Sequence, residues 1–183
     1  LPSAIVRAVP AALDGSMARV DAVLTAVADA DAIVVGPGLT TSPSVGEIVH
    51  ALMRDATAPV VLDADGLNVL GGDLASLDGA RVPLVITPHP GEAARLLGCD
   101  IGEVIADRPG AAARLAGESR VSLVKGARTL VAGADRMAVV LAGNAGLARA
   151  GSGDVLAGMI GTLLAQRVAP FDAAVLAAPL HGR

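Results

Sequence analysis

The chain has 183 residues, 53% of them apolar, and a net charge of −4 at pH 7. A chain of this length can bury one sizeable core and fits one domain better than two. The sequence has no Trp or Tyr and only one Phe, and it lacks the basic stripe that nucleic-acid binders carry. This composition argues against nucleic acid as a partner and favours a small-molecule ligand.

The cellular setting is also constrained by the sequence. Gly, Pro, Asp or Arg interrupts every apolar run before it reaches the roughly 18 to 20 residues that span a bilayer. The first residues lack the basic region and long apolar segment of a signal peptide, and the lone Cys99 cannot form an internal disulfide. We therefore expect a cytoplasmic protein that does not contact a membrane.

The first half of the chain alternates between β-branched runs and stretches of helical period, which is typical of a parallel sheet covered by helices. Apolar residues at i, i+3, i+4 and i+7 predict a helix around residues 20–27. A second helix is predicted from Pro43, with Ser42 as its capping residue. The predicted strands are residues 32–35, 60–63 and 84–87.

The second half is predicted to add more helices and an antiparallel edge. Strands are expected at residues 121–125, 129–132 and 137–141, and their tight glycine-containing connections predict hairpins. Helices are expected at residues 92–97, at 109–117, from Gly153 onward and at 171–180. Gly158 and Gly161 are expected to let the helix from Gly153 pack closely on the sheet. The fold class is therefore α/β.

Residues 143–154 (GNAGLARAGSGD) form a glycine-rich loop that opens into this last long helix. Glycines let the backbone approach a phosphate, and the free N–H groups and dipole of a helix start stabilise negative charge. Asp154 would repel a phosphate unless it has a chemical task. It is either a base that takes a hydroxyl proton during phosphoryl transfer or a residue that caps its helix.

Five blocks carry a resemblance to a known family: residues 35–39 (VGPGL), 62–68 (LDADGLN), 87–92 (TPHPGE), 124–129 (VKGART) and 151–158 (GSGDVLAG). Each block alone could be a strand-ending turn, but all five follow one order over about 120 residues. The chain resembles the ADP- or ATP-dependent NAD(P)H-hydrate dehydratases of the ribokinase-like superfamily. The resemblance implies a three-layer α/β/α fold with a mostly parallel central sheet and an antiparallel edge. It also implies one nucleotide-binding domain over residues 1–183, incomplete at both ends.

The block at 87–92 discriminates best, because related vitamin and sugar kinases usually carry Asn at the position of His89. A His between two prolines at the carboxyl end of a strand lies where ligands bind in such sheets. We therefore favour substrate contact by His89 over a purely structural hydrogen bond.

The resemblance also implies roles for further residues. Gly38, His89 and Asp154 would face the hydrated nicotinamide nucleotide. The adenine nucleotide would be held by Lys125, Gly126, Ala127, Arg128 and Thr129, together with Gly151, Ser152 and Gly153. Glu92 resembles the acid that organises Mg²⁺ through water, although it could simply place a favourable charge in a first helical turn.

The polar residues after the second predicted strand leave a choice between two roles. Asp63, Asp65 and Asn68 could hold a ligand or metal, or they could make local turns. A turn role is favoured for Asp65, and Asn68 is a second candidate for substrate contact. Lys125 is expected to lie close to phosphate, and its alternative role is that of a solvated strand end.

The implied reaction uses ADP or ATP with Mg²⁺ to phosphorylate the C6 hydroxyl of NAD(P)H hydrate, after which elimination of phosphate restores NAD(P)H. Asp154 would be the base. The expected partners are further copies of the chain, for instance in a tetramer, and a separate or fused NAD(P)H-hydrate epimerase.

The loop departs from the family at Ala145, where Pro is usual, and at Arg149, which would either strengthen nucleotide binding or obstruct the pocket. Two other functions remain open from the sequence. One is a kinase for a hydroxymethylpyrimidine, a hydroxyethylthiazole or a sugar, and the other is a nucleotide-binding module without catalysis.

Overall fold

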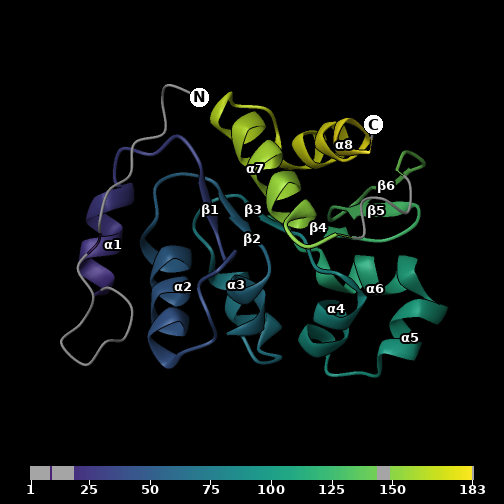
Figure 1. Ribbon diagram of the computed structural model, residues 1–183, viewed down its shortest axis with the longest axis horizontal. Helices are drawn as coiled ribbons and strands as arrows, with labels where there is room; N and C mark the ends of the chain where they lie inside the picture. The colour runs from purple at the N-terminus through teal and green to yellow at the C-terminus, as the bar shows by residue number, and fades with distance from the viewer. Residues whose placement is uncertain (1–8, 10–18, 144–148, 183) are drawn as a thin grey trace.

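The computed structural model describes residue 9, residues 19–143 and residues 149–182 (Figure 1). Six strands form one sheet in the order β1-β2-β3-β4-β5-β6. The strands are β1 (Ile33–Val35), β2 (Val60–Leu62), β3 (Leu84–Ile86), β4 (Arg120–Val124), β5 (Thr129–Ala132) and β6 (Met137–Val140). Neighbouring strands from β1 to β4 are parallel, whereas β4, β5 and β6 pair antiparallel. The predicted parallel sheet with an antiparallel edge is confirmed.

The register of the parallel strands sets where the functional loops begin. Val35 pairs with Leu62, and Leu62 pairs with Ile86. These three residues are the last of β1, β2 and β3, so the strands end level with one another. The loops that follow them consequently start side by side at one edge of the sheet.

Helices cover both faces of the sheet (Figure 1). On one face lie α1 (Val20–Val27), α2 (Pro43–Asp55), α3 (Asp65–Asn68), the 3-10 turn η1 (Leu74–Gly79), α4 (Pro90–Leu97), α5 (Ile101–Ala106) and α6 (Arg108–Leu115). On the other face lie α7 (Ser152–Ala165) and α8 (Pro170–His181). The three-layer α/β/α arrangement expected from the resemblance is confirmed.

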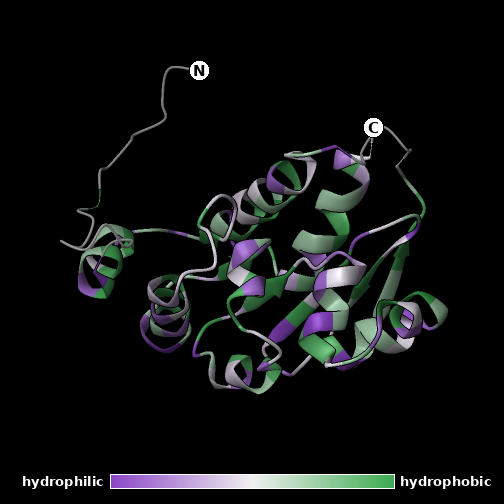
Figure 2. Cartoon of the chain, turned by 60° about the horizontal axis from the view of Figure 1, so that its bottom comes forward, coloured by the Kyte–Doolittle hydropathy of each residue, from purple (hydrophilic) through white to green (hydrophobic). Residues whose placement is uncertain are grey.

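Alternate residues of the strands feed two separate cores. Val60 and Leu62 pack in the core with α2 and its neighbours, whereas Val61 packs in the core with α7 and α8. Every residue of β2 and β3 is buried, because both faces of a parallel sheet are covered. The strands are accordingly coloured mainly as hydrophobic in Figure 2. This double burial explains why the strands read as continuous apolar runs.

Several local predictions need correction. The helix expected at 92–97 begins at Pro90, because His89 occupies the cap position. Ser42 holds the cap position of α2, but its hydroxyl contacts Ser44 Oγ at 2.9 Å and makes no cap hydrogen bond. The short elements α3, η1 and α5 were not anticipated, since none is long enough to show a helical period.

The two packing glycines of α7 behave differently. A Cβ added to Gly161 would lie 2.5 Å from Val34 Cγ2, so close packing on the sheet is confirmed there. A Cβ on Gly158 would meet nothing within 4 Å, so the prediction is wrong for Gly158. Within the described ranges, no helix has the length and apolar character needed to cross a membrane.

Candidate active site

A buried ion pair lies at the carboxyl edge of the sheet. Asp63 follows β2, Thr87 follows β3, and both residues are only 1% exposed. Asp63 Oδ1 accepts hydrogen bonds from Thr87 Oγ1 at 2.8 Å and from Lys125 Nζ at 2.7 Å. Burying a carboxylate is costly unless it is paired and hydrogen-bonded, and these two donors meet that need. The Lys125 side chain is therefore fixed by Asp63 at the carboxyl ends of the strands, and Lys125 is not a solvated strand end.

The start of α4 is organised by His89. Its Nδ1 accepts from the backbone N–H groups of Gly91 at 3.0 Å and Glu92 at 3.4 Å, and Glu92 Oε2 accepts from the backbone N–H of His89 at 2.8 Å. This reciprocal arrangement is a capping box. An accepting Nδ1 carries no proton, so in the neutral ring the proton lies on Nε2. That Nε2 lies 3.4 Å from Glu92 Oε1, so the ring N–H faces the Glu92 carboxylate, while the His89 side chain is 55% exposed and can still be reached by a ligand.

Glu92 brings a second buried carboxylate close to Lys125. The Glu92 side chain is 5% exposed, and its Oε2 lies 3.8 Å from Lys125 Nζ. Among the residues that the structure describes, no group of three or more His, Cys, Asp or Glu side chains could hold a metal ion. Mg²⁺ commonly takes one or two carboxylates and completes its shell with water and phosphate oxygens, so contact through water is the role that a single carboxylate such as Glu92 could fill. That role for Glu92 stays a prediction.

The amino-terminal end of α7 abuts the ion pair. A Cβ added to Gly153 would lie 3.3 Å from Lys125 Nζ and 3.4 Å from Asp63 Oδ2. The cap position of α7 is occupied by Gly151, in the left-handed conformation, so the interpretation of Asp154 as the capping residue is wrong. Asp154 lies in the first turn of α7 and is exposed. The structure thus brings Lys125 together with Gly153, although they are distant in sequence.

Arg108 supports the predicted nucleotide loop at residues 125–129 by hydrogen bonds to its backbone carbonyls and to that of Val124. The Arg108 guanidinium donates to the backbone carbonyls of Ala127 at 2.6 Å, Val124 at 3.3 Å and Lys125 at 3.4 Å. Thr129 Oγ1 donates to the carbonyl of Gly126 at 3.1 Å. These bonds leave Gly126, Ala127 and Arg128 exposed for contact with a ligand. Sequence reasoning missed Arg108, since nothing local links it to a loop about 20 residues later.

The turn after β1 is tied to α3. Asp65 accepts from the backbone N–H of Thr40 at 2.9 Å and from the amide of Asn68 at 3.3 Å, which agrees with a turn role. The amide oxygen of Asn68 accepts from Arg95, so both ends of this amide are engaged within the protein. Gly38 is exposed and has open space beside it. Gly38 is open to a ligand, whereas Asn68 already makes two hydrogen bonds within the protein, and substrate contact by either residue stays a prediction.

The two residues at which the predicted phosphate loop departs from the family are Ala145 and Arg149. Ala145 lies outside the described residues. Arg149 is described and exposed, and its backbone carbonyl accepts from Ser152 N at 3.2 Å.

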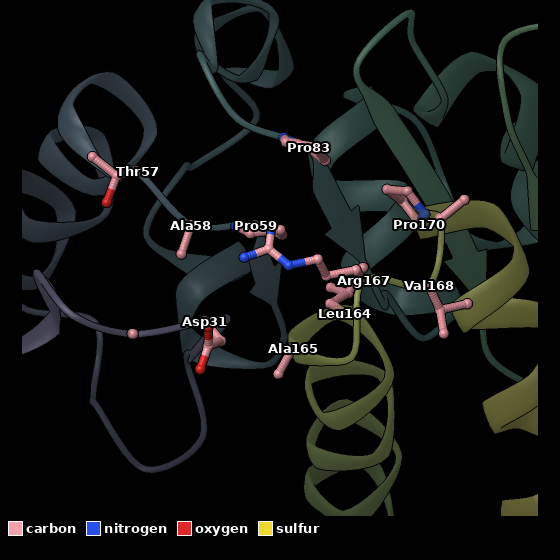
Figure 3. Close-up of a pocket in the computed structure, with 12 residues that line it drawn as sticks. Asp31, Thr57, Ala58, Pro59, Pro83, Leu164, Ala165, Arg167, Val168 and Pro170 are labelled. Atoms are coloured by element: carbon pink, nitrogen blue, oxygen red, sulfur yellow. The ribbon is translucent and has the colours of Figure 1, made fainter.

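A cavity of about 320 Å³ lies at the opposite, amino-terminal end of the strands (Figure 3). Its walls include Pro59 and Pro83, which precede β2 and β3, and Arg167, which follows α7. None of the predicted site residues lines it. We therefore place the candidate active site at the carboxyl edge, where ligands bind in open α/β sheets.

Comparison with known proteins identifies the family of the chain. The family described as NAD(P)H-hydrate dehydratase matches residues 1–183. Over 172 residues the chain is 43% identical to a bifunctional NAD(P)H-hydrate repair enzyme of Moorella thermoacetica, a match that covers 92% of this chain and 32% of that protein. Over 159 residues it is 45% identical to the ADP-dependent (S)-NAD(P)H-hydrate dehydratase of Neisseria meningitidis, covering 84% of this chain and 54% of that protein.

Solved structures of related proteins also resemble this chain. The ADP/ATP-dependent NAD(P)H-hydrate dehydratase of Bacillus subtilis, co-crystallised with ATP/Mg²⁺, matches with a TM-score of 0.71 and 34% identity, over 83% of this chain and 53% of that one. A hydroxyethylthiazole kinase of Pyrococcus horikoshii matches with a TM-score of 0.64 and 25% identity, over 86% and 63% of the two chains. The chain spans from a third to about half the length of the curated relatives described. It belongs to the NAD(P)H-hydrate dehydratase family and has the ribokinase-like fold.

Proposed function

We propose that the protein dehydrates hydrated NADH or NADPH, using ADP or ATP as the phosphoryl donor. One observation carries this proposal: the first turn of α7 meets the Lys125–Asp63 ion pair through Gly153. The Lys125 ammonium group lies beside the first turn of α7, and an ammonium group and the N–H groups of a helix start both favour a phosphate. The names of the Neisseria and Bacillus relatives support the choice of nucleotide and substrate.

The chemistry begins with phosphoryl transfer to the C6 hydroxyl of the hydrated ring. Asp154 accepts the hydroxyl proton while the hydroxyl oxygen attacks the terminal phosphorus of the nucleotide, and the donor's bridging oxygen leaves. The N–H groups at the start of α7 stabilise the charge on the transferring group. Asp154 is an exposed carboxylate in the first turn of that helix, which supports its role as this base.

The second step is an elimination. The lone pair of the ring nitrogen expels phosphate as the C6–O bond breaks, and loss of a proton from C5 restores the ring double bond. Phosphorylation is needed because hydroxide is a poor leaving group. His89, with its exposed donor edge, and Gly38 would position the ring, while Mg²⁺ would arrive with the nucleotide phosphates and contact Glu92 through water.

The direct test follows the return of NADH absorbance from hydrated NADH with ADP, ATP or no nucleotide. Wild type is expected to show nucleotide-dependent recovery, and Asp154→Asn should lower kcat by about a hundredfold or more while binding of ADP persists. Asp172→Asn is a matched control, because Asp172 is an exposed acid in the first turn of α8. It should leave the activity unchanged.

A small-molecule kinase is the second candidate, favoured by the match to the hydroxyethylthiazole kinase. A panel of hydroxymethylpyrimidine, hydroxyethylthiazole and sugar substrates separates the two. Phosphorylated product from this panel, with no NADH recovered, would replace the dehydratase proposal. Binding of nucleotide without any product would indicate a non-catalytic module.

The setting of the enzyme is part of the proposal. We infer a cytoplasmic protein that works with an NAD(P)H-hydrate epimerase, since several relatives are bifunctional repair enzymes. Exposed apolar residues alternate along and just beyond the edge strand β6, at Met137, Val139 and Leu141. They favour assembly into a homo-oligomer, such as a tetramer. Light scattering on the purified protein measures this.

A further inference from the structure

His181, the last residue of α8, contacts the start of α7. Its Nε2 lies 3.0 Å from the hydroxyl oxygen of Ser152, and either atom could be the donor. Ser152 is the first residue of α7 and follows the cap residue Gly151. A side chain from the carboxyl end of one helix thus bonds the residue that opens the predicted phosphate site.

The next residue along the chain, Gly182, lies against Ala142 and Gly143, where the predicted glycine-rich loop begins. A Cβ added to Gly182 would lie 2.7 Å from the backbone nitrogen of Gly143 and 3.0 Å from the carbonyl carbon of Ala142. A contact below 3 Å with backbone atoms cannot be relieved by a rotamer change, so only glycine fits here. His181 and Gly182, adjacent in the chain, therefore lie against Ser152 and Gly143 respectively.

We propose that His181 is a positioning residue that directs the Ser152 hydroxyl proton toward a nucleotide phosphate. A serine hydroxyl has a single proton to donate. If the neutral His181 ring accepts at Nε2, that proton is used within the protein. If Nε2 carries the proton, His181 donates to Ser152 and the hydroxyl proton is free for a phosphate oxygen. The inference rests on the proposed function, because it takes a nucleotide phosphate as the ligand.

The first experiment measures ADP binding calorimetrically, alongside the melting temperature. His181→Ala removes the donor, and the dissociation constant of ADP is expected to rise about tenfold. His181→Gln keeps an N–H group at nearly the place of Nε2 and should recover most of the affinity. His50→Gln is the matched control, because His50 lies exposed on α2, remote in sequence from the loop. It should bind ADP as wild type does.

A second experiment determines which ring nitrogen of His181 carries the proton. The sequence contains three His residues, so the nitrogen-15 signals of their rings can be assigned with the His50 and His181 variants. With ADP bound, His181 is expected to carry a proton on Nε2. A bound state in which His181 is protonated on Nδ1 alone would overturn the proposal.

The remaining outcomes separate this inference from the proposed function. Equal ADP affinity in wild type and His181→Ala would overturn the inference while leaving the dehydratase proposal intact. If both His181→Ala and His181→Gln weaken binding and lower the melting temperature together, the role of His181 is structural and the inference is wrong. ADP binding without recovery of NADH would remove the dehydratase proposal, and the His181 variants would still test nucleotide positioning. If wild type binds neither ADP nor ATP, both ideas fail.

Discussion

Lys125 Nζ and Asp63 Oδ1 lie 2.7 Å apart, and they join the predicted nucleotide loop to the end of a buried central strand. The carboxylate is 1% exposed, while the lysine side chain is 22% exposed. The positive charge that would meet a phosphate is therefore oriented before any ligand arrives. Such preorganisation lowers the reorganisation that binding and catalysis require.

Breaking this pair should destabilise the protein. Asp63→Asn leaves the ammonium without its main partner, and we expect a loss of about 2 kcal/mol in the free energy of unfolding, less than for a fully buried pair. Urea denaturation of Asp63→Asn, Lys125→Met and the double variant gives the coupling between the two. Additive effects in this cycle would show that the two side chains do not stabilise each other.

Gly153→Ala should separate affinity from stability. The new methyl group would lie 3.3 Å from Lys125 Nζ, which must move slightly, and in ordinary contact with Asp63 Oδ2 at 3.4 Å, and so would disturb the phosphate site. We expect ADP affinity to fall about tenfold, the size of one charge-assisted hydrogen bond. Stability should change little, because the higher helix propensity of alanine, about 1 kcal/mol, offsets the cost of shifting Lys125 Nζ. Calorimetric binding and thermal melting measure the two effects.

The matched control for that change is Gly158→Ala in the same helix. An added Cβ at Gly158 meets nothing within 4 Å, so the substitution should stabilise the protein by about 0.5–1 kcal/mol and leave ADP binding unchanged. If Gly153→Ala binds ADP as tightly as Gly158→Ala, the contact of α7 with the ion pair has no part in nucleotide binding.

His89 has a capping role and a proposed substrate role, and two variants separate them. His89→Ala removes the cap of α4 and should cost about 1 kcal/mol of stability. His89→Asn restores a good cap but not the Nε2 donor, so it should be nearly as stable as wild type. We expect kcat/KM for hydrated NADH to fall about tenfold or more in both variants. Full activity of His89→Asn would limit His89 to the helix cap.

Arg108 should act on nucleotide binding through the loop carbonyls that it contacts. Lysine cannot reproduce the fork of N–H groups that reaches three carbonyls, so Arg108→Lys is expected to weaken ADP binding several-fold. Arg114→Lys, on the exposed side of the same helix, is the control. Calorimetry on both proteins decides the matter, and equal affinities would mean that the loop needs no support from α6.

The strands of the sheet could be predicted from the sequence because the signals that identify them are local. Each parallel strand is a short apolar run, and the turns at Gly126 and Gly133 mark the antiparallel edge. The side-chain contacts within the site could not be predicted from local sequence signals. Asp63 and Lys125 are 62 residues apart, and Ser152 and His181 are 29 residues apart, so no periodicity connects them. The interpretation of Asp154 as a cap failed because a glycine in the left-handed conformation took the cap position first.

The turns after β1 and β2 are in close main-chain contact at two glycines. A Cβ on Gly36 would lie 1.7 Å from the carbonyl oxygen of Asp63, and a Cβ on Gly66 would lie 2.8 Å from that of Val35. Neither position can change without moving the other turn, so neither can be used to alter the shape of the site. Divergence toward new substrates on this scaffold would therefore fall to the side chains that follow β3 and β4 and to those that open α7.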